Sequence, residues 1–220
     1  LTHDLIADGF SPEETSAAEP AAEAGTLELV SLTVEVPMKH HNGATLRNLI
    51  NLIYTRAGLL NKALGTSFRV DEELIEALKD DACTLTTDSL LQVIGDFEAE
   101  HGKAIDGLTF TPEGITFASL PETTDAEKLR TFTILAGMMN KQALDQKRIQ
   151  AKAVSDENEK YALRIWLTRL GMNGPEYKEA RGVLMENLTG NSAFRTKAEE
   201  EKWKACQAKK REAAKATGGK

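Results

Sequence analysis

The sequence predicts an α+β fold, rich in helix, in which a small three-stranded antiparallel sheet is covered by helices and followed by a helical C-terminal region. Apolar residues alternate with polar ones over 30–36 and again over 108–117, which is the period of strands that bury one face. Elsewhere apolar residues recur at steps of three and four, the period of helices that pack along one side. A strand, several helices, a hairpin and further helices, in that order, are typical of the α+β class.

The predicted sheet combines one strand with one hairpin. Strand 30–36 is followed by Pro37, which ends the alternating pattern. Within 108–117, the turn Pro112-Glu113-Gly114 separates two short alternating runs, and its glycine can adopt the positive φ that a tight turn requires.

Three helices are predicted between the strand and the hairpin. A glycine ends the first and the third, Asp71 opens the second, and Thr86 or Thr87 caps the third. The three predicted helices span residues 46–64, 71–78 and 86–102.

A long helix is predicted after the hairpin. Thr124 and Glu127 have the spacing of a capping box, and the apolar stripe that follows continues to Ile149. A second box, from Asp156 to Glu159, restarts or continues this helix.

The break Gly171-Met172-Asn173-Gly174 separates it from a further helix, which Pro175 starts at a first-turn position. Because helix 175–188 carries more Glu than Lys and Arg, we interpret the pair as a structural helical hairpin rather than a helix-turn-helix that enters DNA. Residues 197–215 are charged and rich in alanine, which is typical of a frayed helix or a tail.

These elements predict four regions along the chain. Residues 1–25 are acidic, without Lys or Arg, and are expected to form a disordered leader. Residues 26–154 form the α+β domain, residues 155–195 a helical hairpin region, and residues 196–220 a charged C-terminal tail.

Composition and motifs argue against several classes of protein. The apolar runs are far shorter than the roughly 20 residues that span a bilayer, and the acidic N-terminal stretch is unlike a signal peptide. Two cysteines provide neither a disulfide framework nor a zinc-ligand spacing. We therefore expect a cytoplasmic protein without a metal or a cofactor.

No enzyme signature is present either. The sequence has no glycine-rich phosphate-binding loop and no His-Glu-x-x-His pair. The neighbouring His40 and His41 are interpreted as part of a polar loop, and Cys83 follows the acidic pair Asp80-Asp81, which would raise the pKa of a thiol. The chain is therefore expected not to be an enzyme, with no catalytic residues to assign.

Charge is distributed very unevenly along the chain. Residues 1–140 contain 9 Lys and Arg against 23 Asp and Glu, a net charge of −14, whereas residues 141–220 contain 18 against 11, a net charge of +7. This asymmetry suggests an anionic partner for the basic half, a cationic partner for the acidic half, or attraction between the two halves.

The first hypothesis is a non-enzymatic protein whose basic C-terminal half contacts nucleic acid. Its candidate contacts are the basic residues Lys141, Lys147, Arg148, Lys152, Arg164, Arg169, Lys209, Lys210 and Arg211. Of these, Lys147, Arg148 and Lys152 are expected to share one face of the long helix. The alternative is an inhibitor of a host nucleic-acid enzyme or defence system, acting by protein–protein binding through its acidic surface.

Two segments carry a resemblance. The stretch NEKYALRIWLTRLGMNG at 158–174 and the stretch LTGNSAFR at 188–195 resemble uncharacterised proteins of bacterial mobile genetic elements, often described only as hypothetical or virulence-related. The resemblance extends over 45–64 and 146–152 and implies a setting, a plasmid, phage or conjugative element, rather than a reaction. Small proteins from that setting often handle nucleic acid or block host defences, including CRISPR nucleases.

Overall fold

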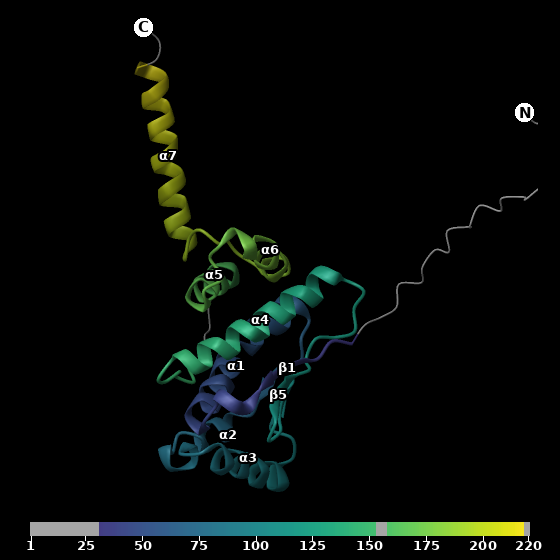
Figure 1. Ribbon diagram of the computed structural model, residues 1–220. Helices are drawn as coiled ribbons and strands as arrows, with labels where there is room; N and C mark the ends of the chain where they lie inside the picture. The colour runs from purple at the N-terminus through teal and green to yellow at the C-terminus, as the bar shows by residue number, and fades with distance from the viewer. Residues whose placement is uncertain (1–30, 153–157, 218–220) are drawn as a thin grey trace, which may run out of the picture.

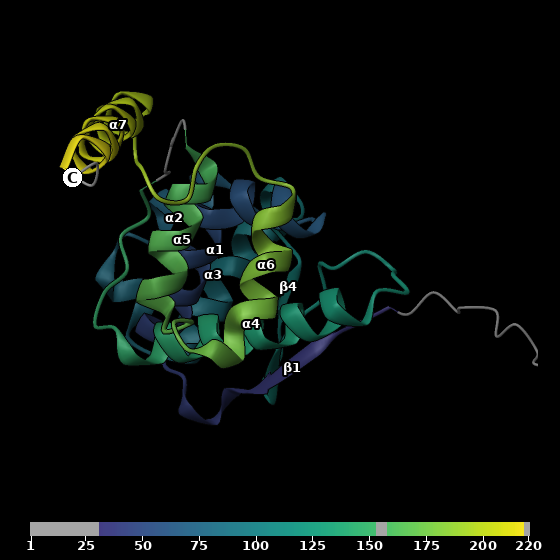
Figure 2. The same cartoon turned by 90° about the horizontal axis from the view of Figure 1, so that it is seen from above.

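The computed structural model describes residues 31–152 and 158–217, apart from the side chains of Cys83 and of residues 210–217. Figure 1 shows the arrangement of its helices and strands, and Figure 2 shows the same arrangement from above. The strands are β1 (Val34–Pro37), β2 (Arg69–Val70), β3 (Ile105–Asp106), β4 (Leu108–Phe110) and β5 (Gly114–Phe117). The α-helices are α1 (Gly43–Leu64), α2 (Glu72–Ala77), α3 (Thr87–His101), α4 (Ala126–Asp145), α5 (Glu159–Leu170), α6 (Lys178–Glu186) and α7 (Lys197–Thr217). Three short 3-10 helices accompany them: η1 (Met38–His40), η2 (Asp81–Thr84) and η3 (Pro175–Tyr177).

The predicted α+β class and the three-stranded antiparallel sheet are confirmed. The strand order is β1-β5-β4, so the hairpin strand β5 lies in the middle and pairs with β1 from Val34 opposite Phe117 to Pro37 opposite Gly114. The first strand is shorter than expected, because residues 31–33 are not part of it and residue 30 lies outside the described residues.

A second, two-stranded sheet was not predicted. It pairs β2 with β3, and Arg69 Nε donates a hydrogen bond of 2.7 Å to Asp106 Oδ2 across it. Two residues per strand are too few to show an alternating pattern in the sequence.

Helix α1 is the centre of the fold, packed against α3, α4 and α6. It begins with a capping box between Asn42 and Thr45 and ends at Gly65 in the left-handed conformation, at φ 75°. Apolar residues along its whole length, including Leu46 and Ile53, are completely buried. The helix was predicted over 46–64, so its first turn is the only part that the apolar stripe does not mark.

Helix α4 differs from its prediction at both ends. Its cap is Asp125 rather than Thr124, since the Asp125 carboxylate accepts hydrogen bonds from the backbone N–H groups of Glu127 and Lys128. It ends at Asp145 instead of continuing to Ile149. The residues after it form an irregular segment, which is hydrogen-bonded to side chains of α1.

The C-terminal helices share the core of the preceding domain. Leu163 and Trp166 of α5 and Leu184 of α6 belong to the same buried cluster as the residues of α1 and α4. Helix α5 is capped by Asn158, whose side chain accepts from Tyr161 N, while the predicted cap Asp156 lies outside the described residues. Helix α6 packs against α1 and α4.

Helix α7 forms where a frayed helix or a tail was expected. It projects away from the body, at the end of the molecule opposite α2 and α3 (Figure 1). Most of its described side chains are exposed, and Trp203 contacts Phe194 just before the helix, with ring centroids 5.5 Å apart. Within the described ranges, no helix combines the length and apolar character needed to cross a membrane.

Candidate functional site

Two asparagines on α1 bind the segment that follows α4. The side-chain amide of Asn48 donates to the carbonyl oxygens of Ala143 (3.3 Å) and Gln146 (2.6 Å), and its Oδ1 accepts from Ile149 N at 2.8 Å. Asn51 Nδ2 donates to Ile149 O at 2.9 Å. These buried amides satisfy backbone groups that a continued helix would have satisfied itself, so they end α4 and fix the course of 146–152.

Because α4 ends at Asp145, the predicted basic patch has a different geometry from the one expected. Lys147, Arg148 and Lys152 were expected on one face of a helix, but they lie in the irregular segment after α4. The structure still brings two of them together, because Arg148 and Lys152 both line one cleft. Lys147 is exposed immediately before Arg148 and does not line it.

The cleft lies between α1, the end of α2 and the segment 146–152, and has a volume of about 380 Å³. Its lining residues are Arg47, Asn51, Ile75, Leu78, Lys79, Arg148, Ile149, Gln150, Ala151 and Lys152. Four of these side chains are cationic and none carries a carboxylate. Such a concave cationic site is suited to an anion. We refer to it below as the basic cleft.

The deepest cation in the basic cleft is Arg47. Its side chain is only 9% exposed, and its Nη1 donates to Leu78 O (3.4 Å) and to Asp81 Oδ1 (2.7 Å). Asp81 stands beside the cleft with a side chain that is 74% exposed. The hydrogen bond from Arg47 lowers the pKa of Asp81, and the charges of Arg47 and Arg148 act in the same direction.

The other cations of the cleft differ in how they are paired. Lys79 forms an ion pair with Glu76 one turn earlier on the surface. Arg148 and Lys152 make no ion pair with any carboxylate of the described residues. Their charges therefore remain available to a ligand.

The remaining predicted contacts do not join the basic cleft. Lys141 is exposed on α4. Arg164 lines a separate hollow between α5 and α6, where its Nη1 donates to Ser192 O at 2.9 Å. Arg169 is exposed near the end of α5, and Lys209 is exposed on α7. Lys210 and Arg211 belong to α7, but their side chains lie outside the described part of the structure.

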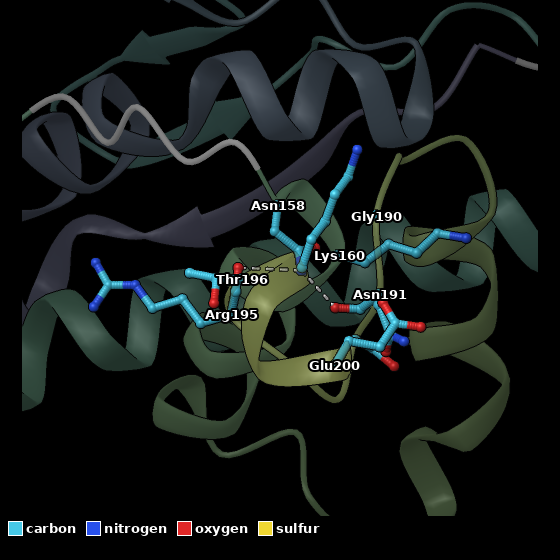
Figure 3. A pocket seen from close by; sticks show the side chains of 9 residues that line it. Asn158, Lys160, Gly190, Asn191, Arg195, Thr196 and Glu200 are labelled. Carbon is cyan, nitrogen blue, oxygen red and sulfur yellow. Dashed lines mark hydrogen bonds between the residues drawn. The ribbon is translucent and has the colours of Figure 1, made fainter. Parts of the chain in front are cut away.

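A larger cavity, of about 680 Å³, lies between the start of α5 and the start of α7 (Figure 3). The side-chain amide of Asn158 donates there to the carbonyl oxygens of Asn191 (2.9 Å) and Phe194 (2.5 Å), so it holds the connecting loop together. The charged side chains in the lining are Lys160, Arg195, Lys197 and Glu200. Unlike the basic cleft, this cavity is therefore lined by charges of both signs.

Sequence reasoning missed Arg47, Asn48 and Asn51 as parts of the site. No local signal marks them, because they lie beside the apolar stripe of α1, at positions where a solvent-facing polar residue is also ordinary. A polar group that a helix buries must find a partner, which here is the segment 146–149 or Asp81. The partners themselves are distant in sequence and carry no pattern of their own.

The acidic half also has a concentrated surface. Residues 71–100 contain 10 Asp and Glu but only one Lys, and they form α2, η2 and α3. Several of their carboxylates are exposed and form no ion pair with another described residue: Glu72, Glu73, Asp80, Asp88, Asp96 and Glu100. We call this region the acidic face; it lies at the end of the molecule opposite α7 (Figure 1).

Of the two neighbouring histidines, His41 joins two helices. His41 Nε2 is 2.8 Å from Asn140 Oδ1 and its Nδ1 is 3.1 Å from Thr45 Oγ1, so the ring ties α1 to α4. Burial lowers the pKa of His41. Over the described ranges, no group of three or more His, Cys, Asp and Glu side chains is arranged to hold a metal ion.

Comparison with protein families, with curated proteins and with solved structures found no match to this chain. The case for a function therefore depends on its own residues.

Proposed function

We propose that this protein binds nucleic acid, with the basic cleft as the principal contact, where Arg148 and Lys152 of the basic half meet Arg47 and Lys79 of the first half. The observation that carries the proposal is the convergence of Arg47, Lys79, Arg148 and Lys152 on one concave site without a lining carboxylate. Phosphate is the anion that nucleic acid presents, and Arg and Lys are the side chains that bind it best.

The arrangement also limits what kind of contact this is. No helix of the described residues carries a basic face next to the cleft, and Arg164 and Arg169 lie elsewhere on α5. The proposed contact is therefore to phosphates rather than to base edges, and we expect little preference for sequence. The resemblance to proteins of mobile genetic elements is compatible with such a role and adds a setting to the proposal.

The test uses the full chain, because residue 141 lies inside α4 and a basic fragment cut there would divide a buried helix. Fluorescence anisotropy with a labelled single strand and a labelled duplex measures Kd at several salt concentrations. Counterion release predicts a log–log slope of about −0.7 per contacted phosphate for single strands and about −0.9 for duplex.

The decisive variant reverses Arg148 and Lys152 to Glu. Its matched control reverses Lys39 and Lys178, which are exposed, lie outside the cleft and change the net charge equally. We expect the cleft variant to lose binding and the control to keep most of it. A third variant, which reverses Lys209, Lys210 and Arg211, measures the share of α7 separately. Equal losses from cleft and control, or no binding by the wild type at low salt, would refute the proposal.

A second candidate function is favoured by the acidic face. We propose as the alternative that unpaired carboxylates over α2 and α3 bind a basic surface of a host nucleic-acid enzyme and inhibit it. Purification of the tagged chain from its native host, with and without nuclease treatment, separates the two functions. A partner that survives nuclease and is lost when Asp88, Asp96 and Glu100 are changed to Asn, Asn and Gln would favour inhibition.

A further inference from the structure

The cations of the basic cleft converge on one hollow and do not form a row. Its cations converge from α1, from the end of α2 and from the segment 146–152 on a volume of about 380 Å³. That volume lies within the range of small-ligand sites, about 300–1,000 Å³, so it has room for a terminal phosphate with part of the nucleotide that carries it. A groove that follows a polynucleotide backbone would instead present its cations in a line.

The surroundings of the cleft disfavour a continuous polyanion. One of its walls belongs to the end of α2 and Lys79, and two acidic residues, Asp80 and Asp81, follow directly in the chain. A duplex or strand laid across the cleft would bring further phosphates against these carboxylates. A strand that ends in the cleft would not, because its remaining phosphates can lead away from the acidic face.

Arg47 has binding capacity that the fold does not use. A guanidinium has five N–H donors, and among the described residues only Nη1 of Arg47 is engaged. Its chief partner is the carboxylate of Asp81, whose side chain is 74% exposed. This side chain can therefore rotate away from Arg47 without disturbing the core. A phosphate in the cleft would take the position of that carboxylate and could use the free donors as well.

We infer that the basic cleft binds a phosphate monoester, the terminal phosphate of a nucleic-acid strand, and that Asp81 competes with it for Arg47. The inference rests on the proposed function, since it names which phosphate of the nucleic acid the cleft takes. A monoester carries a charge of about −1.5 to −2 at pH 7, against −1 for an internal phosphodiester. The cleft cations therefore favour the end of a strand, since Arg148 and Lys152 have no carboxylate partner among the described residues. Asp81 then binds Arg47 when no ligand is present, and this competition lowers the affinity of the cleft for the phosphate.

The experiment compares two single-stranded oligonucleotides of the same sequence, labelled at the 3′ end, with either a 5′ phosphate or a 5′ hydroxyl. We expect the full chain to bind the phosphorylated strand about tenfold more tightly. Changing Arg148 and Lys152 to Gln should remove this difference, whereas the same change at Lys39 and Lys178 should leave it. If both strands bind equally, the end-recognition inference is wrong and the proposed function stands; if neither strand binds, the proposed function itself fails.

The role of Asp81 is tested with Asp81→Asn against Asp80→Asn. Both variants remove one exposed carboxylate from η2 or its cap, but Asp80 accepts from Ala82 N and makes no contact with Arg47. We expect Asp81→Asn to tighten binding of the phosphorylated strand several-fold more than Asp80→Asn does, with the melting temperature measured for both. Equal effects of the two changes would overturn the competition.

Competition experiments identify the source of the phosphate. Displacement of the phosphorylated strand by a nucleoside monophosphate at equal concentration would support the monoester site but overturn its assignment to strand ends, since a free nucleotide would then suffice. Displacement only by other phosphorylated strands would support the site and assign it to strand ends. Displacement by the 5′-hydroxyl strand as effectively as by the phosphorylated one would overturn the inference.

Discussion

Changing Asn48 to Ala should weaken both the fold and the basic cleft without changing the charge of the protein. Asn48 is 1% exposed and makes three hydrogen bonds that join α1 to residues 143–149. At about 1 kcal/mol for each net bond, their loss costs about 3 kcal/mol, with a further cost if a buried partner is left without water. The alanine recovers about 0.6 kcal/mol through its better helix propensity, so we expect a net loss of about 2–4 kcal/mol.

Asn51 provides a matched control for this prediction. It lies one turn further along α1, is 8% exposed, and donates one hydrogen bond to the same segment. Because Asn51→Ala gains the same helix propensity, the difference between the two variants isolates the additional bonds of Asn48. We expect Asn51→Ala to cost about 1 kcal/mol or less.

The assay is urea unfolding of the full chain at pH 7, followed by far-UV circular dichroism, together with the anisotropy measurement on the phosphorylated strand. Asn48→Ala should lower the unfolding midpoint with an unchanged m-value. It should also weaken binding, since Arg148 and Lys152 would no longer be held at the cleft. Surface substitutions usually change the free energy of unfolding by no more than about 0.5 kcal/mol. If Asn48→Ala stays within that range, or loses only as much stability as Asn51→Ala, these bonds do not organise the segment.

Two further predictions concern stability. Alanine should change the free energy of unfolding in opposite directions at two glycines of α1. Gly58→Ala should stabilise the protein by about 0.5–1 kcal/mol, because nothing lies within 4 Å of the new Cβ. Gly43→Ala should destabilise it by about 1–3 kcal/mol, because the new Cβ would collide with the backbone oxygens of Thr84 and Thr86. Urea unfolding of both variants measures this, and two changes of the same sign would contradict it. The hydrogen bond from Lys62 and the backbone N–H of Thr189 lower the pKa of Glu159 to about 2. Because the folded pKa lies below the unfolded one, the stability that Glu159 contributes is present at pH 7 and is lost as the pH falls from about 4.5 to about 2. Glu159→Gln should therefore be less stable than wild type at pH 7 and equal to it near pH 2 in unfolding curves measured across that range, and a constant difference at every pH would refute this assignment.

The sequence was informative where a buried face repeats regularly. The alternation in 30–36 and 108–117 and the stripe of α1 have regular periods, so the sheet, its hairpin and the central helix could be predicted. The end of α4 could not, because Ile149 lies at a position where the apolar stripe of the helix could continue, while Asn48, about a hundred positions earlier, binds the backbone of this segment. A local sequence pattern does not reveal a partner that is so distant in the chain.

The candidate site, like the fold, could be predicted from the sequence only in part. Arg148 and Lys152 were found as charges, but their meeting with Arg47 depends on a cleft that three distant segments enclose. Arg164 looked equivalent in sequence and lies in a different hollow. Charge counts identified which half of the chain is basic, and only the fold determines which cations share a surface.

The pairing of β1 with β5 has a consequence for the order of events during synthesis. Val34 cannot find Phe117 until some eighty further residues have been made, which takes about 4–16 s at the usual rate of 5–20 residues per second. The hairpin of β4 and β5, by contrast, forms within about 1–10 μs once it is free. Throughout that delay β1 is an unpaired apolar strand, open to other nascent chains. Glu35 and Pro37, a charge and a residue without a backbone N–H, lie within this strand, and both discourage pairing with a wrong partner.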